Sequence, residues 1–162
     1  MPKKNKQNLP DTKKIPVSKI MKKSFRFVHK GTEIKEILGL FHKYDVEAFP
    51  VVNSKGKLIG EITENQMMPF AISTERLSEH DIIGALGTRI QTIFGARVGD
   101  IMNMHELTVE KTNTLEDAAY LMWKHDVRCL PVVDKETNKF LGVVFQKNII
   151  DFIKKYKEEL IQ

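Results

Sequence analysis

The feature that most constrains this 162-residue chain is an internal repeat, because its second half restates its first. The matching stretches are Val17–Met21 with Val98–Met102, Tyr44–Val52 with His125–Val133, and Leu58–Ile62 with Phe140–Val144. The first two pairs are offset by 81 residues (Pro50 to Pro131) and the third by 82 (Gly60 to Gly142). The extra residue falls in a polar turn, where insertions are tolerated. We therefore expect two copies of one small fold.

Each copy contains a predicted amphipathic helix, because apolar residues recur there at the spacing of one helix face. These residues are Ile34, Ile37, Leu38 and Phe41 in the first copy and Leu115, Ala118, Ala119 and Met122 in the second. Asn113, followed three residues later by Glu116, has the pattern of an N-cap and its partner.

Two predicted strands follow each helix. The first is a short apolar run, at Phe49–Val52 or Leu130–Val133, which is typical of a buried strand. After a polar turn the second strand covers Lys57–Thr63 or Lys139–Phe145, so the pair reads as a hairpin. A second helix comes next, from about Lys147 to Tyr156 in the second copy. The predicted fold is α/β (α+β), with the order β-α-β-β-α in each repeat.

A unit of about 60 residues buries little surface by itself, so we expect the two copies to pack together. The predicted organisation is a basic flexible tail (1–16), a first repeat (17–73), a helical connector (74–97), a second repeat (98–157) and a C-terminal end (158–162). The connector is predicted as an amphipathic helix, because Ile82, Ile83, Leu86, Ile90, Ile93 and Phe94 recur at helical spacing. Packing of this helix on the module is favoured over packing on a partner subunit.

The residues that catalysis or metal binding would require are not assembled in this sequence. No phosphate-binding glycine motif of the Walker or Rossmann type and no Gly-x-Ser-x-Gly elbow occurs. The five histidines do not pair at metal-ligand spacing, and the single cysteine, Cys129, precedes a buried strand as a packing residue. We expect His42 and His125 to lie at helix C-termini. The chain is predicted not to be an enzyme.

The net charge of +5 is concentrated in the tail, where five lysines accompany one aspartate in the first sixteen residues. The rest of the chain is near neutral, which argues against a nucleic-acid-binding face. Binding of nucleic acid through the lysine tail stays a low-ranked alternative to a solvated leader. No apolar run reaches the roughly 20 residues of a membrane helix, and no signal peptide is evident, so we expect a cytoplasmic protein.

The repeated motifs give the chain a family resemblance over about residues 17–157. Val-x-x-Ile-Met, a helix, Pro-Val-Val and a glycine-containing strand, in two copies, resemble a tandem pair of CBS (cystathionine-β-synthase-type) domains, also called a Bateman module. The resemblance implies two repeats packed through their sheets with pseudo-two-fold symmetry. It also implies clefts for AMP, ADP, ATP or S-adenosylmethionine, a homodimer, and regulation of a partner protein that the sequence does not identify.

The resemblance also indicates which residues would hold the ligand. In the family, a Ser or Thr near phosphate and an Asp near ribose follow the glycine of the second strand. The first copy has Thr63 and Gln66 at these positions, and the second has Phe145 and Asn148. The implied clefts lie between the repeats, and each borrows from the other copy the backbone before its Pro-Val-Val, so that Thr63 shares a cleft with Val127, Arg128 and Cys129. The strand residues before the hydroxyl position and the residues near Lys19 and Asp100 also line the clefts. Besides the four named above, the implied residues are Val46, Ala48, Ile62, Asp100, Val127, Arg128, Cys129 and Val144.

These departures from the family pattern leave two functions open. Gln66 and Asn148 keep an amide oxygen that accepts a hydrogen bond, without the strength of a charge-assisted one. Arg128 offers a guanidinium for phosphate, and Phe145 is expected to fill its cleft. The first hypothesis is a stand-alone regulatory module that binds an adenosine-containing ligand. The alternative is a protein-interaction scaffold whose clefts are occluded.

Overall fold

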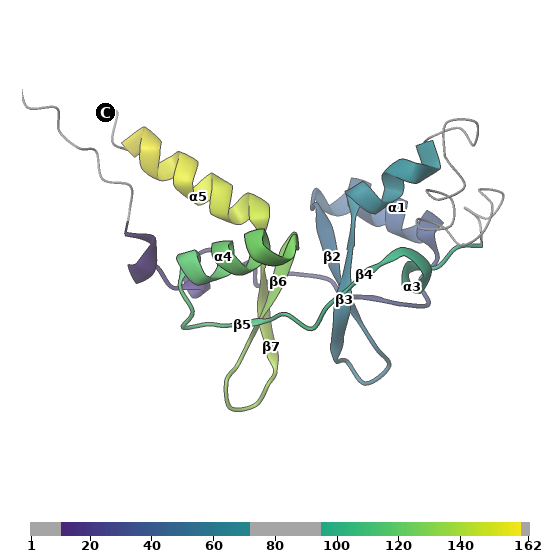
Figure 1. Cartoon of the computed structure of the whole chain (residues 1–162), viewed down its shortest axis with the longest axis horizontal. Helices are drawn as coiled ribbons and strands as arrows, with labels where there is room; N and C mark the ends of the chain where they lie inside the picture. Colours follow the sequence, from purple (N-terminus) through teal and green to yellow (C-terminus); the bar gives the residue numbers. More distant parts are fainter. Residues whose placement is uncertain (1–10, 72–94, 160–162) are drawn as a thin grey trace, which may run out of the picture. The chain divides into compact units, whose positions relative to one another are not determined.

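A computed structural model describes residues 11–71 and 95–159 of the chain, which divide into two compact units (Figure 1). One unit consists of Arg26–Leu107 and is called here the Thr63 unit. The other combines Met1–Phe25 with Thr108–Gln162 and is called the Phe145 unit. The first residues of each repeat, 17–25 and 98–107, are called here its leading segment. Each leading segment belongs to the unit that contains the rest of the other repeat. The domain limits drawn from the sequence remain predictions about the repeats.

The Thr63 unit contains a mixed sheet with the strand order β1-β2-β3-β4. Strands β1 and β2 are parallel, and the other neighbours are antiparallel. Its elements are β1 (Val28–His29), α1 (Ile34–Tyr44), β2 (Ala48–Val52), β3 (Leu58–Thr63), the 3-10 helix η3 (Glu64–Ala71), α3 (Val98–Ile101) and β4 (Asn103–Met104).

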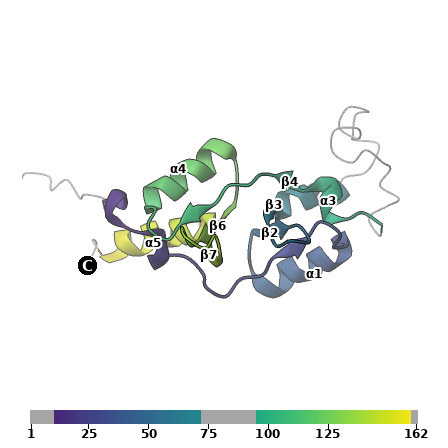
Figure 2. The same cartoon turned by 90° about the horizontal axis from the view of Figure 1, so that it is seen from below.

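The Phe145 unit repeats this design with the strand order β5-β6-β7. Its elements are η1 (Thr12–Lys14), η2 (Val17–Lys19), β5 (Val109–Glu110), α4 (Leu115–His125), β6 (Cys129–Val133), β7 (Phe140–Phe145) and α5 (Gln146–Glu159). Cys129 pairs with Phe145 in this unit as Ala48 pairs with Thr63 in the other. The predicted mixed α/β fold is therefore confirmed, and Figure 2 shows α1 and α4 each running beside the hairpin of its own unit.

The core of each unit lies between its hairpin and the apolar face of its first long helix. All five residues of β2 and of β6 are buried. In the Thr63 unit, Ile34, Ile37 and Phe41 of α1 belong to the same buried cluster as Val51 and Ile62. The assignment of Leu38 to the buried face of this helix was wrong, because Leu38 is 45% exposed and Leu40 is buried in its place.

The helix ends explain one repeated motif and correct one prediction. Asp45 and Asp126, repeated after α1 and α4, both have the left-handed conformation that ends a helix. The N-cap of α4 is Thr114, whose hydroxyl accepts from the Asp117 N–H, so the predicted Asn113 cap is one residue early. Asn113 instead accepts a hydrogen bond from the Glu110 N–H, which closes the preceding turn.

Two glycines allow the leading segments to cross the hairpins closely. A Cβ atom on Gly60, whose φ is +155°, would lie 2.1 Å from the carbonyl oxygen of Asn103. A Cβ atom on Gly142 would lie 2.8 Å from the carbonyl oxygen of Lys22. The repeated glycine is therefore required by the backbone that crosses it.

Two predicted segments lie wholly or largely outside the described residues: most of the connector helix (74–97) and the lysines of the tail before residue 11. Among the helices that the structure describes, none has the length and apolar character needed to span a bilayer.

Candidate ligand-binding site

The twelve residues implied by the family resemblance divide between the two units, six in each, and all but Asp100 form two half-sites. In the Thr63 unit, Ala48 and Thr63 pair across the open end of the β2–β3 hairpin, with Ile62 and Gln66 on either side of Thr63 in the chain. In the Phe145 unit, Cys129 and Phe145 pair at the equivalent end of β6–β7. Each half-site therefore lies where a strand ends and the next helix begins, away from the hairpin turn (Figure 1).

Most members of the half-sites are buried apolar residues, and Thr63 is a buried polar one. The buried apolar residues are Ala48, Ile62, Val127, Cys129, Val144 and Phe145. Cys129 is fully buried, which agrees with its predicted packing role. Polar contact with a ligand is left to Thr63, Gln66, Arg128 and Asn148.

Gln66 is fixed by two hydrogen bonds to its own strand end. Its Oε1 atom accepts from the Thr63 N–H at 2.7 Å and from the Thr63 hydroxyl at 3.2 Å. Because a backbone N–H can only donate, the amide atom that faces it must be oxygen. Both lone pairs of this oxygen are thereby used, so Gln66 meets a ligand with its NH₂ group. The expectation that the Gln66 oxygen would accept a ligand hydrogen bond is corrected accordingly.

Asn148 forms the equivalent but simpler contact in the Phe145 unit. Its Oδ1 atom accepts from the Phe145 N–H at 3.0 Å, across the same three-residue spacing. Phe145 has no hydroxyl to occupy the second lone pair, so the amide oxygen retains one acceptor site as well as two N–H donors. The two half-sites thus offer different hydrogen bonds although their amides take the same position.

The two half-sites differ in the charge of the side chains that flank their strand ends. Arg128 Nη1 donates to Gln146 Oε1 at 2.7 Å, and Arg128 Nη2 lies 3.7 Å from Asp126 Oδ1. The backbone link from Gln146 N–H to the Arg128 carbonyl recurs from Glu64 N–H to the Glu47 carbonyl. A guanidinium and an amide in one unit therefore correspond to two carboxylates in the other. A phosphate is favoured near Arg128 and disfavoured near Glu47 and Glu64.

Asp100 is not brought to the other residues of its half-site. Its carboxylate accepts from the Arg97 N–H at 2.8 Å and caps its own short helix, α3. This helix is bonded to Lys30 and Thr32, which follow β1 next to Val52. Ala48 and Thr63 lie at the opposite end of β2.

Sequence reasoning missed Lys22 as a neighbour of the Phe145 half-site. The Lys22 ammonium lies over the Phe145 ring, 5.7 Å from its centroid. The repeat itself marks this position, because Lys22 follows the first Ile-Met pair as Asn103 follows the second. Strand pairing was needed to connect this position with β7.

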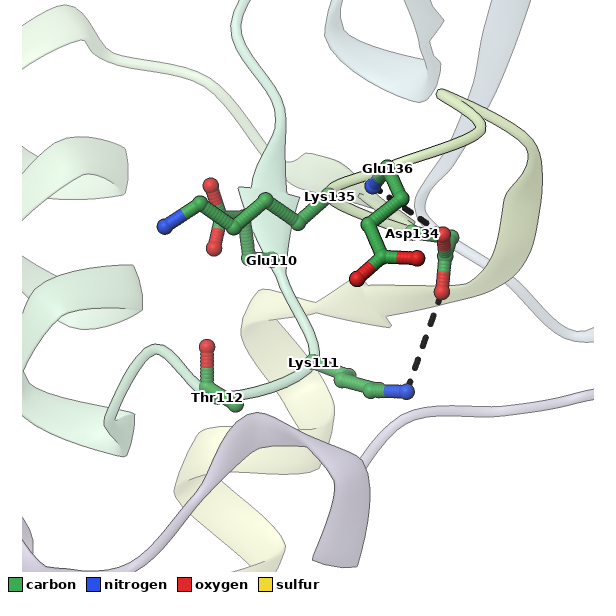
Figure 3. Close-up of a pocket in the computed structure, with 6 residues that line it drawn as sticks. All are labelled: Glu110, Lys111, Thr112, Asp134, Lys135 and Glu136. Carbon is green, nitrogen blue, oxygen red and sulfur yellow. Dashed lines mark hydrogen bonds and ion pairs between the residues drawn. The ribbon is translucent and has the colours of Figure 1, made fainter.

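A shallow depression of about 280 Å³ occurs in the Phe145 unit at the other end of the hairpin (Figure 3). Its lining residues are Glu110, Lys111, Thr112, Asp134, Lys135 and Glu136. Asp134 accepts from the Thr137 and Glu136 N–H groups and lies 3.7 Å from Lys111 Nζ. Hydrogen bonds from the Thr137 N–H and hydroxyl are the main reason that the pKa of Asp134 lies below its usual value. The aspartate thus organises the β6–β7 turn, and its mixed charges select no ligand class.

Two equivalent units, each with a half-site where a hairpin meets a helix, define a tandem α/β module. The sequence pattern of the CBS domain matches residues 17–70 and 98–155, and the chain therefore belongs to the CBS domain family, with two domains in tandem.

Known proteins of similar sequence include two that match most of the chain. An uncharacterized protein of Methanocaldococcus jannaschii, MJ1426, is 27% identical over 151 residues, which cover 83% of this chain and 89% of that protein. The chloroplastic CBS domain-containing protein CBSX1 of Arabidopsis thaliana is 29% identical over 145 residues, or 80% of this chain and 59% of that protein.

The fold is also that of a solved structure. The crystal structure of CBSX2 in complex with AMP matches with a TM-score of 0.64 and 25% identity, over 87% of this chain and 97% of that one. An enzyme, inosine-5'-monophosphate dehydrogenase of Helicobacter pylori, is 28% identical over 124 residues, but the match covers only 21% of the enzyme. The similarity thus spans a minor part of that enzyme and nearly all of the crystallised CBSX2 chain.

Proposed function

We propose that this chain is a stand-alone regulatory module, not an enzyme, that binds an adenosine-containing ligand in its half-sites and thereby alters a partner protein. Among AMP, ADP, ATP and S-adenosylmethionine, AMP is the first candidate, because CBSX2 was crystallised with AMP. The ligand acts by binding one conformation more tightly than another, since only differential affinity shifts an equilibrium.

The observation that carries this proposal is the fixed amide at the start of each helix. Gln66 and Asn148 are both held by the last N–H of the preceding strand. Each therefore presents its NH₂ group in a set orientation, without the conformational freedom of an unrestrained side chain. Amide donors suit the hydroxyl oxygens of ribose and the oxygens of phosphate.

Thermal denaturation of the purified chain with a panel of nucleosides and nucleotides tests the proposal. AMP at 100 times its Kd should stabilise the fold by about 2.7 kcal/mol, and guanosine monophosphate should stabilise it much less. The proposal fails if no adenosine compound raises the Tm at millimolar concentration. It also fails if guanosine and adenosine compounds act equally.

One observation favours a second candidate function. Phe145 is only 5% exposed, and it occupies the position of the family's hydroxyl. A filled half-site would make the Phe145 unit an interaction scaffold, with the adenosine-containing ligand confined to the Thr63 unit. Binding of AMP that perturbs the Thr63 half-site alone would support this division.

We further propose that two copies of the chain associate through the exposed aromatic face of α4. Trp123 is 80% exposed there, and its ring lies 6.4 Å from that of Tyr120. The helix is self-complementary, with Glu116 and Asp117 in its first turn and Lys124 and His125 in its last. An antiparallel pair centred on Tyr120 places Glu116 opposite Lys124 of the second copy. The occupant of this face is therefore a second copy of the chain.

The regulated partner is a protein whose identity these half-sites do not specify. A cytoplasmic location and nucleic-acid binding through the lysine tail both remain predictions.

A further inference from the structure

The leading segment of the chain places one lysine at the Phe145 half-site. The Lys22 N–H donates to the Val143 carbonyl at 2.9 Å, and the Val143 N–H donates to the Lys22 carbonyl at 3.0 Å. This two-way pairing fixes the Lys22 backbone beside β7, two residues before Phe145. The side chain is exposed, and its ammonium lies 5.7 Å from the centroid of the buried Phe145 ring. The lysine position therefore follows from the strand pairing and from attraction to the ring.

The positions equivalent to Lys22 and Phe145 carry different kinds of side chain in the Thr63 unit. Asn103 pairs with Glu61 as Lys22 pairs with Val143, and Thr63 takes the place of Phe145. One half-site thus combines a hydroxyl with a neutral neighbour, whereas the other combines an apolar ring with a cation. The Thr63 half-site therefore has a hydroxyl and no lysine at these two positions, whereas the Phe145 half-site has a lysine and no hydroxyl.

The Lys22 ammonium retains its capacity to bind an anion. Within the part of the chain that the structure describes, Lys22 forms no ion pair with a carboxylate. A lysine ammonium has three N–H donors, and contact with a ring face satisfies none of them as a hydrogen bond to oxygen does. Arg128, before β6, adds a second cationic side chain to this unit's half-site.

We propose that Lys22 is the anion-binding and specificity-determining residue of the Phe145 half-site. It contacts a phosphate or another anionic group of the ligand while Phe145 contacts the apolar part. This half-site consequently selects charged nucleotides over uncharged nucleosides. The inference rests on the proposed function, namely that an adenosine ligand binds at this half-site.

Amide signals in NMR spectra of the ¹⁵N-labelled full chain can test the two half-sites separately. AMP and adenosine are titrated while the Phe145 and Thr63 amides are followed. In Lys22→Met, which keeps the apolar stem, the AMP affinity read from Phe145 should weaken about tenfold or more. The adenosine affinity should stay within about twofold, because adenosine carries no anion. The matched control is Lys23→Met, an adjacent exposed lysine, which should bind AMP as the wild type does.

The possible outcomes separate this inference from the proposed function. Unchanged AMP affinity at Phe145 in Lys22→Met overturns the role of Lys22. Equal losses for AMP and adenosine also overturn it, because they indicate a structural effect. If AMP moves the Thr63 amide and not the Phe145 amide in the wild type, only the inference about Lys22 fails. If neither AMP nor adenosine moves either amide, the proposed function fails as well.

Discussion

The Nε2 atom of His105 lies 3.9 Å from Oε2 of Glu61; the Glu61 side chain is fully buried and that of His105 is 9% exposed. The other ring nitrogen, Nδ1, accepts from the Leu107 N–H, and Nε2 is left without a hydrogen-bond partner. His105 belongs to the leading segment of the second repeat, and Glu61 to β3 of the first. The His105 N–H donates to the Ile59 carbonyl of β3 at 3.2 Å, and this backbone bond holds the imidazole beside Glu61. The equivalent residues of the Phe145 unit are Ser24 and Val143.

Replacing His105 by the residue of the other unit should destabilise the fold. His105→Ser removes the imidazole from beside a buried carboxylate, at an expected cost of about 1–3 kcal/mol in urea unfolding. The double variant Glu61→Val with His105→Ser copies the apolar arrangement of the Phe145 unit and should recover most of this loss. His42→Ser, at an exposed histidine of α1, is the control and should have little effect. Additive losses in the double variant would contradict the pairing.

The glycines under the leading segments should not tolerate alanine. Gly60→Ala places a Cβ atom 2.1 Å from the Asn103 carbonyl oxygen, and Gly142→Ala places one 2.8 Å from that of Lys22. Both variants must displace backbone, so each should lose about 2 kcal/mol or more, with Gly60→Ala the worse. Gly39→Ala, in the exposed middle of α1 with open space around it, should instead gain up to about 1 kcal/mol. Calorimetric Tm values that place Gly142→Ala above the wild type would contradict the close approach.

The sequence predicted the hairpins and helices well because their signals are local. Pro-Val-Val runs, polar turns and helical spacing each depend on a few neighbouring residues, and β6 begins at Cys129, one residue before the predicted start. The same reasoning placed Leu38 on the buried face of α1, where Leu40 lies instead. Apolar spacing alone does not distinguish two adjacent faces of a helix.

The exchange of leading segments could not be predicted, because a repeat in sequence does not reveal which unit each segment joins. Pairing of Lys22 with Val143 and of Asn103 with Glu61 depends on residues far apart in the chain. The candidate site shows the same limit. The family pattern indicated Gln66 and Asn148, whereas the hydrogen bonds that fix their amide groups depend on helix geometry.

Acid should weaken the contribution of the α4 cap. Hydrogen bonds from Thr114, its backbone N–H first, lower the pKa of Asp117 below the ordinary value of 3.8. A lowered pKa stabilises the fold above the unfolded-state value, and this stability is lost as the pH falls through the folded-state value. Asp117→Ala should therefore cost about 1 kcal/mol at pH 7 and progressively less below pH 4. Asp151→Ala, at an exposed position of α5, is the control. A difference in Tm that stays constant down to pH 2.5 would exclude the charged cap.

Sedimentation equilibrium can test the proposed association through α4. Trp123→Ala should weaken the dimer by about 2 kcal/mol or more, since exposed aromatic anchors dominate such interfaces. Met104→Ala, equally exposed at 82% but outside α4, should not change the dimer. Glu116→Lys and Lys124→Glu should each weaken association, and their combination should restore it, because the charges are exchanged across the antiparallel pair. A wild-type chain that is monomeric at high concentration would exclude this interface.

Restoring the family's carboxylate in the Phe145 half-site should raise its affinity for ribose. Asn148→Asp keeps the side-chain length, and the Phe145 N–H that now donates to Oδ1 at 3.0 Å can donate to the carboxylate as well. The second oxygen then replaces the amide NH₂ group and accepts from ribose hydroxyls through charge-assisted bonds, which are about twice as strong as neutral ones. We expect adenosine to bind about tenfold more tightly in calorimetric titration, with 2',3'-dideoxyadenosine unchanged. An equal gain for the dideoxy compound would show that the new carboxylate acts elsewhere than on ribose.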